Sequence, residues 1–159
     1  MTKQPDFYLF TDGSADTINK NGVGAYLLLS SLEDLPKQVE VKTKKFQNTS
    51  STKLEIEALI WALSDNELQN KKVVVYTDSQ NIVGLPGRRI RLEKNNFISK
   101  NGKELKNKEL YIQYYKLFDL IDLQILKIKG HKATKEKSDL DRIFSLVDKA
   151  ARKQIRESW

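Results

Sequence analysis

The hydrophobic pattern over the first third of the chain predicts three β-strands. Residues 6–12 are short, apolar and aromatic, as expected of a buried strand, and residues 22–29 form a second apolar run. The small polar residues between them, 13–21, predict a loop. Residues 38–46 alternate apolar and charged side chains, which is typical of a strand at a sheet edge with one face in solvent. Short turns separate the three strands, so we expect an antiparallel meander.

After residue 47 the pattern changes to helical spacing. Residues 48–52 offer several N-caps, and residues 54–63 repeat apolar side chains at helical intervals. Residues 73–77 are β-branched and aromatic, which predicts a buried central strand. Residues 78–81 can cap a short helix, and Pro86-Gly87 predicts its end.

The second half of the chain predicts two more helices and a fifth strand. Apolar residues at 110, 114, 117, 118 and 121 share one helix face, residues 123–128 form a strand, and a helix spans 139–156. The element order predicts an α/β fold with a five-stranded mixed sheet, an antiparallel meander plus parallel strands, flanked by helices. We expect a single domain over residues 1–159.

Composition excludes several classes of protein. The chain has no Cys and one His, which excludes disulfide frameworks, thiolate metal sites and multi-His metal centres. No apolar run is long enough to cross a bilayer, and the N-terminus lacks the apolar core of a signal peptide. We therefore expect no membrane association and a cytoplasmic location.

Positive charge is concentrated in one part of the chain. The 28 basic residues exceed the 21 acidic ones by seven, and residues 88–108 hold eight basic and two acidic residues. A second stretch, 127–137, carries five Lys and one Glu. Such clusters favour a polyanionic partner, although a lysine-rich solvated face explains the composition equally well.

Three carboxylates occupy positions where metal chemistry is possible. Asp12 ends the first strand, Asp78 ends the fourth, and Glu55 lies early in the first helix. Ligands bind beyond the carboxyl ends of strands in α/β sheets, and crowded carboxylates need a cation. Oxygen ligands suit Mg²⁺. Taken singly, each acid is also explained as a turn residue, an N-cap or a solvated helix residue.

Five motifs together resemble one known family, ribonuclease H type 1, over essentially the whole chain. In chain order they are Phe10-Thr-Asp-Gly-Ser14, Lys53-Leu-Glu-Ile56, Tyr76-Thr-Asp-Ser-Gln80, Lys129-Gly-His131 and Val147-Asp-Lys-Ala-Ala-Arg152. The resemblance implies the ribonuclease H-like fold. It also implies an endonuclease that cuts the RNA strand of RNA–DNA hybrids and leaves 3′-hydroxyl and 5′-phosphate ends.

The resemblance also implies the composition of the catalytic site. Asp12, Glu55, Asp78 and Asp148 would hold two Mg²⁺ ions, with Mn²⁺ able to substitute, and His131 would assist proton movement or product release. Asp141 lies nearer the spacing expected for the fourth carboxylate, but Asp148 has the expected neighbours and lies deeper in the apolar helix. We therefore choose Asp148.

Substrate-binding positions carry over in the same way. The basic segment 88–108 takes the place of the family's basic protrusion, without the tryptophans of the cellular bacterial form. Expected contacts are Ser50, Ser51, Thr52, Gln80, Arg88, Arg89, Arg91 and Asn107. The expected partner is an RNA–DNA hybrid duplex, bound by a monomer. Two other functions stay open, a DNA-directed nuclease or recombinase of the same fold and a catalytically silent nucleic-acid-binding module.

Overall fold

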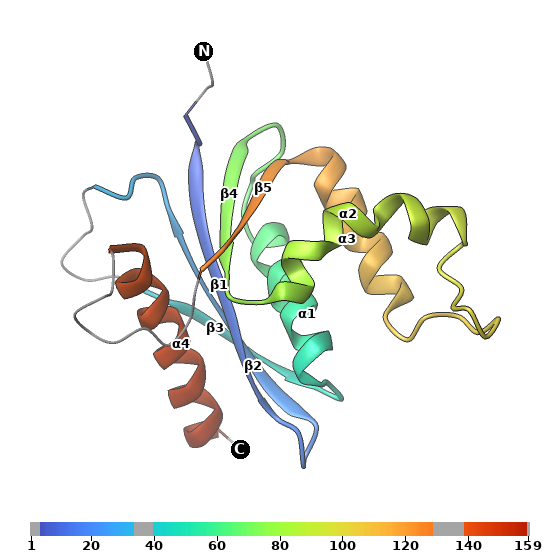
Figure 1. The fold of residues 1–159 in the computed structure, drawn as a ribbon. Helices are drawn as coiled ribbons and strands as arrows, with labels where there is room; N and C mark the ends of the chain where they lie inside the picture. Colours follow the sequence, from blue (N-terminus) through green and yellow to red (C-terminus); the bar gives the residue numbers. More distant parts are fainter. Residues whose placement is uncertain (1–3, 34–39, 129–138, 159) are drawn as a thin grey trace.

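The computed structural model describes residues 4–33, 40–128 and 139–158. In this part of the chain, strands and helices follow the order predicted from the sequence (Figure 1). Their bounds are β1 Phe7–Asp16, β2 Asn21–Leu29, β3 Lys42–Gln47, α1 Ser51–Ser64, β4 Lys72–Thr77, α2 Gln80–Lys94, α3 Lys108–Leu120, β5 Asp122–Lys127 and α4 Asp139–Ser158.

The five strands form one mixed sheet in the order β3-β2-β1-β4-β5. β1 pairs antiparallel with β2, and β2 with β3, which is the predicted meander. β1 pairs parallel with β4, and β4 with β5. The predicted fold class is therefore confirmed. β1 is the middle strand, and β4 lies between β1 and β5 with its apolar run, Val73–Tyr76, buried along its length.

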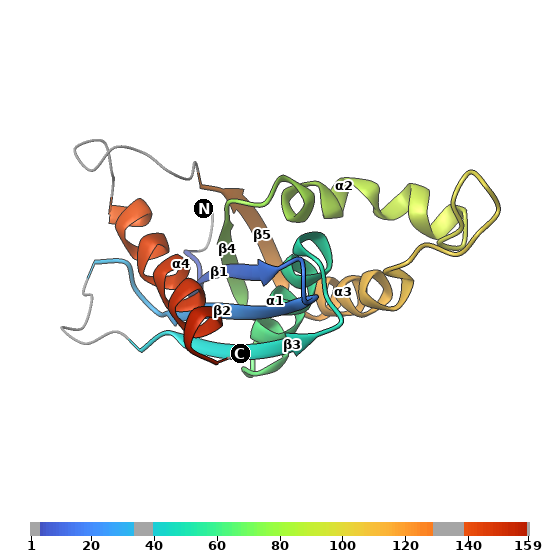
Figure 2. The same cartoon turned by 90° about the horizontal axis from the view of Figure 1, so that it is seen from below.

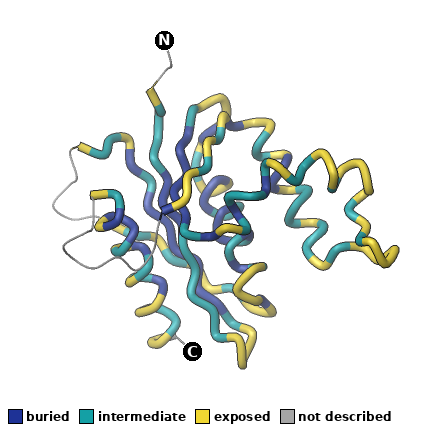
Figure 3. Tube along the Cα trace, in the orientation of Figure 1, coloured by how far each residue is buried: buried dark blue, intermediate teal, exposed yellow. Residues whose placement is uncertain are grey.

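Helices cover both faces of the sheet. α1, α2 and α3 lie on one face and α4 lies on the other (Figures 1 and 2). Each face has its own apolar core, one with Leu59 and Tyr114 near its centre and the other with Phe10 and Val147. Figure 3 shows that burial is deepest along the central strands, while the end of α2 and the loop after it are exposed.

The first hairpin is longer than the sequence pattern predicts. Residues 13–21 were expected to form a loop, but β1 runs to Asp16 and β2 starts at Asn21, so this expectation is wrong. The Asp16 carboxylate accepts hydrogen bonds from the backbone N–H groups of Ile18 and Asn19 at 3.1 and 3.2 Å, which closes the turn. Backbone pairing thus extends the strands through residues whose side chains show no hydrophobic alternation.

Helix α2 continues through Pro86, where the sequence predicted its end. The predicted end is wrong because Ile82 and Leu85 anchor the helix in the core. The Arg88 guanidinium also spans the proline and donates to the main-chain oxygen of Asn81 at 2.7 Å. The first third of the basic segment is therefore helical.

Two further points concern the remaining expectations. The third strand begins at Lys42 and ends at Gln47; residues 38 and 39 of the predicted strand lie outside the described residues. Within the described part of the chain, every helix is too short or too polar to cross a membrane.

Glycine lets α1 approach the sheet closely. A Cβ added to Gly24 on β2 would lie 2.9 Å from the Cβ of Ala58 on α1 and 3.0 Å from the Phe46 ring. Both neighbours are held by the fold, so neither can move away cheaply. The contact between α1 and the sheet therefore depends on the absence of a side chain at this position.

We expect Gly24→Ala to destabilise the protein by about 1–3 kcal/mol, because α1 must move away from β2. Gly87→Ala is a matched control: a Cβ there meets nothing within 4 Å. Since Gly87 lies in a helix, its replacement by Ala should stabilise by about 0.5–1 kcal/mol. Urea unfolding measures both, and equal stabilities would contradict the close-approach argument.

Candidate active site

The parallel pairing of β1 with β4 brings two of the predicted carboxylates together. Phe10 pairs with Tyr76, and their rings stack with centroids 4.8 Å apart. Asp12 and Asp78 each follow two residues later, so both lie at the same edge of the sheet. Asp12 and Asp78 also line the same small pocket, so the two carboxylates are neighbours.

Helix α4 adds a third carboxylate. Val147 is fully buried against the sheet, and the adjacent Asp148 shares a side-chain hydrogen bond with Asp12. Arg152, one turn later, lies 3.1 Å from Asp148 Oδ2 and holds it in place. The side chain hydrogen-bonded to Asp12 is thus that of Asp148. Asp141 lies in the first turn of α4, about 10 Å earlier along the helix axis.

Glu55 reaches the same place from α1. The Ser79 hydroxyl donates to Glu55 Oε2 at 2.6 Å, so the start of α2 orients the carboxylate. Ser79 also caps α2 by accepting from the Ile82 N–H at 3.2 Å. A small pocket is lined by Asp12, Glu55 and Asp78 together with neighbouring residues of β1 and β4.

The clustering changes the acidity of these groups. Burial, the hydrogen bond with Asp148 and the charge of Asp78 together raise the pKa of Asp12 to about 8. Burial also raises the pKa of Glu55, which the hydrogen bond from Ser79 partly opposes and the charge of Asp78 reinforces. Full ionisation of these carboxylates is therefore unfavourable unless a proton or a cation compensates their charge.

A divalent cation fits this donor set. Carboxylate oxygens are the ligands that Mg²⁺ prefers, and the crowding of Asp12, Asp78 and Asp148 is the condition that a cation relieves. Among residues 4–33, 40–128 and 139–158, no group of three acidic or histidine side chains is close enough to hold a metal ion without rearrangement.

A basic pocket of about 450 Å³ lies beside the N-terminus of α1. Three segments contribute to it: the β1–β2 turn, the junction of β3 with α1, and the residues before α3. Among the predicted contacts it contains Ser50, which caps α1, and Asn107. The full lining of this basic pocket is Thr17, Lys20, Asn48, Thr49, Ser50, Lys53, Lys106 and Asn107.

The other predicted polar contacts lie in different places. Ser51 and Thr52 are exposed on the first turn of α1 and do not line the basic pocket. Gln80 is exposed at the start of α2, where its side-chain oxygen accepts from Lys127 Nζ at 3.0 Å. His131 lies outside the described residues.

Two of the predicted arginine contacts are engaged within the protein. Arg88 Nη2 donates to the main-chain and side-chain oxygens of Asn81 at 2.7 and 2.8 Å. Arg89 binds both oxygens of Asp119 at 2.5 and 2.7 Å and stacks over the Tyr115 ring. Arg88 therefore braces α2 internally. Arg89 connects α2 to α3 and has most of its charge neutralised locally.

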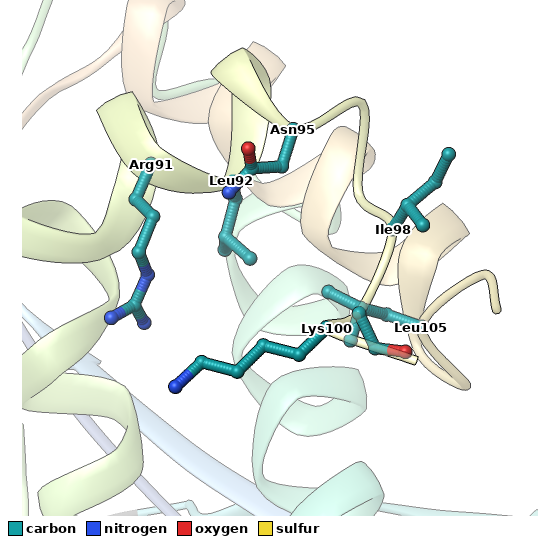
Figure 4. A pocket seen from close by; sticks show the side chains of 7 residues that line it. Arg91, Leu92, Asn95, Ile98, Lys100 and Leu105 are labelled. Atoms are coloured by element: carbon teal, nitrogen blue, oxygen red, sulfur yellow. The ribbon is translucent and has the colours of Figure 1, made fainter. Parts of the chain in front are cut away.

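Arg91 differs because it lines a cavity of about 530 Å³ in the protruding end of α2 and the loop that follows. Figure 4 shows the Arg91 guanidinium and the Lys100 ammonium extending to the same side of this cavity. Leu92 and Leu105 contribute its apolar part. We refer to this cavity as the protrusion pocket.

Several residues of these sites were not identified from the sequence. Lys20, Lys53 and Lys106 join the basic pocket from segments far apart in the chain, so only tertiary contact groups them. Ser79 lies among residues 78–81, which the sequence indicates only as possible helix caps, and its hydrogen bond to Glu55 depends on the packing of α1 beside α2. Lys106 does lie in the basic segment 88–108, which was the one available signal.

We expect Asp12→Asn to stabilise the metal-free protein. The folded pKa of Asp12, about 8, exceeds the ordinary value of 3.8, so the wild-type protein loses stability as pH rises through that interval. The variant lacks this loss. It should be more stable by on the order of 2 kcal/mol at pH 7 in EDTA, and the difference should vanish below about pH 4.

Urea unfolding at the two pH values measures this difference. Asp122→Asn is the matched control, since Asp122 is an exposed carboxylate on β5 remote from Asp12. Equal stability of the Asp12 variant and the wild type at pH 7 would contradict the crowding of charge at this site.

Comparisons with known proteins agree with this geometry. The family model described as RNase H matches residues 4–155. A ribonuclease H of Actinobacillus pleuropneumoniae is 31% identical over 137 residues, 85% of each chain. One of Caldicellulosiruptor saccharolyticus is 26% identical over 152 residues, covering 94% of this chain and 95% of the relative.

A solved structure shares the fold. The solution structure of the PFV RNase H domain superposes with a TM-score of 0.75 at 21% identity and covers 95% of this chain and 94% of that one. The family match extends over all the described strands and across the four carboxylates. The chain therefore belongs to the ribonuclease H family, nucleases that act on RNA–DNA hybrids and generally depend on divalent metal ions.

Proposed function

We propose that this chain hydrolyses the RNA strand of RNA–DNA hybrids, leaving 3′-hydroxyl and 5′-phosphate ends, with two Mg²⁺ ions or Mn²⁺ in their place. The observation that carries the proposal is the meeting of carboxylates from β1, α1, β4 and α4 beside a lysine-lined pocket. Asp12 interacts with both Asp78 and Asp148, and Glu55 shares a small pocket with Asp12 and Asp78.

The four acids have distinct tasks in this proposal. Asp12, within β1, and Asp78, directly after β4, would hold cations, and Asp148 would complete the site from α4. Glu55, held by Ser79, would contact both a cation and the RNA 2′-hydroxyl. Bound divalent ions supply a nucleophile at neutral pH and neutralise the charge that develops on the phosphate.

The protein groups around the acids would orient the substrate. Gln80 has its oxygen occupied by Lys127, so its amide N–H groups are available to a base edge or a sugar. Ser50 and Asn107 would hold a phosphate in the basic pocket, where three lysines supply positive charge. His131 is proposed to move a proton or to assist product release.

The protrusion would bind the duplex away from the cut. Arg91 and Lys100 extend to the same side of the protrusion pocket and can neutralise backbone phosphates. Arg88 and Arg89 would contribute less directly, since Arg88 braces α2 and Arg89 joins α2 to α3. We further propose that the chain acts as a monomer, as a single domain over residues 1–159, and in the cytoplasm.

A cleavage assay with labelled RNA–DNA hybrid, double-stranded RNA and duplex DNA should distinguish a hybrid-specific ribonuclease from nucleases that act on other duplexes. With Mg²⁺ we expect cleavage of the RNA strand in the hybrid alone. Asp148→Asn should lower kcat by at least roughly 100-fold, because a cation ligand is lost. Asp141→Asn should leave activity within about threefold, since Asp141 sits a full two turns away in α4.

Either of two results would count against the proposal. Cleavage of duplex DNA without cleavage of the hybrid would indicate a DNA-directed enzyme. Loss of activity in the Asp141 variant with retention in the Asp148 variant would reassign the fourth carboxylate.

Replacing both Arg91 and Lys100 with Ala should weaken hybrid binding and flatten its salt dependence. Each phosphate contact removed should lower the slope of log Kd against log salt by about 0.9. Arg89→Ala is the control, because its charge is already paired with Asp119. It should reduce stability but leave the slope unchanged. The measurement is fluorescence anisotropy of labelled hybrid in EDTA, and an unchanged slope in the double variant would exclude the protrusion pocket from binding.

A further inference from the structure

Glu57 is a second acid on α1, and it faces away from the proposed catalytic site. It lies two residues after Glu55, which in a helix turns its side chain toward nearly the opposite side. Its Oε1 accepts a hydrogen bond from the hydroxyl of Thr49 at 2.5 Å. Side chains in a helix lean toward its N-terminus, so Glu57 can reach back to the residue just before the helix cap.

Thr49 is a wall residue of the basic pocket, and it is almost fully buried. Only 5% of its surface is exposed, and its methyl group packs close to Gly22 of β2. Its N–H donates to the carbonyl of Lys20 at 2.9 Å, which joins the β1–β2 turn to the junction before α1. Thr49 therefore connects two of the three segments that form the pocket.

The backbone on both sides of this connection is held in an uncommon conformation. Lys20 and Asn48 have φ angles of 58° and 52°, in the left-handed region that residues other than Gly rarely adopt. Such conformations persist where surrounding contacts enforce them. The bond from Thr49 to Glu57 is a contact of this kind, and an ionised acceptor makes it stronger than a bond between neutral groups.

Glu57 does not line the basic pocket, so its negative charge is not part of the pocket wall. Lys20, Lys53 and Lys106 line the cavity, and no carboxylate is among the described residues that do so. Glu57 thus acts on the wall from the α1 side and leaves the cavity itself positive. An anion in the pocket would meet lysines, hydroxyls and amides whose arrangement depends on the wall.

We propose that Glu57 is a positioning residue, which through Thr49 holds the Asn48–Ser50 wall of the basic pocket in the form that receives a substrate phosphate. This inference rests on the proposed function, because it takes the occupant of the pocket to be a phosphate of the hybrid. It assigns to Glu57 a role in substrate affinity and none in the chemical step.

Two pairs of variants test the proposal. Glu57→Leu and Thr49→Val remove the hydrogen bond, and each should raise KM for the hybrid about three- to tenfold while kcat stays within about twofold. Glu57→Gln and Thr49→Ser retain an acceptor and a donor, and each should stay near the wild-type KM. The variant with both Glu57→Leu and Thr49→Val should be no worse than either single change, because both remove the same bond.

A matched control separates positioning from general stability. The Tyr26 hydroxyl donates to Asp65 Oδ2 at 2.5 Å at the other end of α1, so Tyr26→Phe removes a chemically similar bond far from the pocket. It should lower stability in urea and leave KM unchanged. Glu57→Leu should in addition lower the salt slope of hybrid binding in EDTA by up to about 0.9, the value for one phosphate contact.

Three results would overturn the proposal: an unchanged KM in Glu57→Leu, a fall in kcat at constant KM, or a Gln variant as impaired as the Leu variant. Failure of the proposed function would look different. The wild-type protein would then leave the hybrid uncut. The salt slope of hybrid binding in EDTA, measured for the wild type and Glu57→Leu, would still report on the role of Glu57. Lys20→Ala supplies the reference for a lost phosphate contact in the same pocket.

Discussion

The parallel register between β1 and β4 is the constraint on which the proposed active site depends. The pairing of Phe10 with Tyr76 sets two carboxylates side by side, and the stacking of those rings opposes any slip. A shift of one residue would send Asp12 to the other face of the sheet, away from α4. The register is maintained by the two apolar cores, because alternate residues of each central strand must reach opposite faces.

Gathering four acids in one place has an electrostatic cost, and the structure limits it with specific partners. Ser79 donates to Glu55, Arg152 lies against Asp148, and Asp12 is hydrogen-bonded to Asp148. These contacts stabilise the cluster in the absence of a cation but do not neutralise it, as the raised pKa of Asp12 shows. The same imbalance gives the site its affinity for a divalent ion. The charge of Asp12 therefore lowers the stability of the metal-free protein and at the same time favours the binding of a divalent ion.

Basic residues in this protein have two physical roles, which the net charge of the chain does not distinguish. Arg88 bonds to Asn81 across Pro86 within α2, and Arg89 joins α2 to Asp119 of α3. Lysines that line the basic pocket, and Arg91 with Lys100 at the protrusion pocket, face open cavities. The planar guanidinium with several donors suits the first role; in the second role flexible lysine ammonium groups predominate, with Arg91 beside them.

Much of this protein follows from its sequence alone. Apolar periodicity determines the order of strands and helices, because each element must bury one face, and local motifs identify Asp12, Glu55 and Asp78. The prediction that Asp12 ends the first strand is wrong, because pairing with β2 extends β1 to Asp16. The sequence also marks both Asp141 and Asp148 as candidates on one helix face. Only the tertiary structure brings Asp148 to Asp12, because Val147 beside it is fully buried against the sheet. The long first hairpin, the continuation of α2 through Pro86 and the grouping of Lys20, Lys53 and Lys106 likewise depend on contacts between distant segments. Local pattern cannot encode such contacts, since hydrogen bonds and charges act between whichever groups the packed elements bring together.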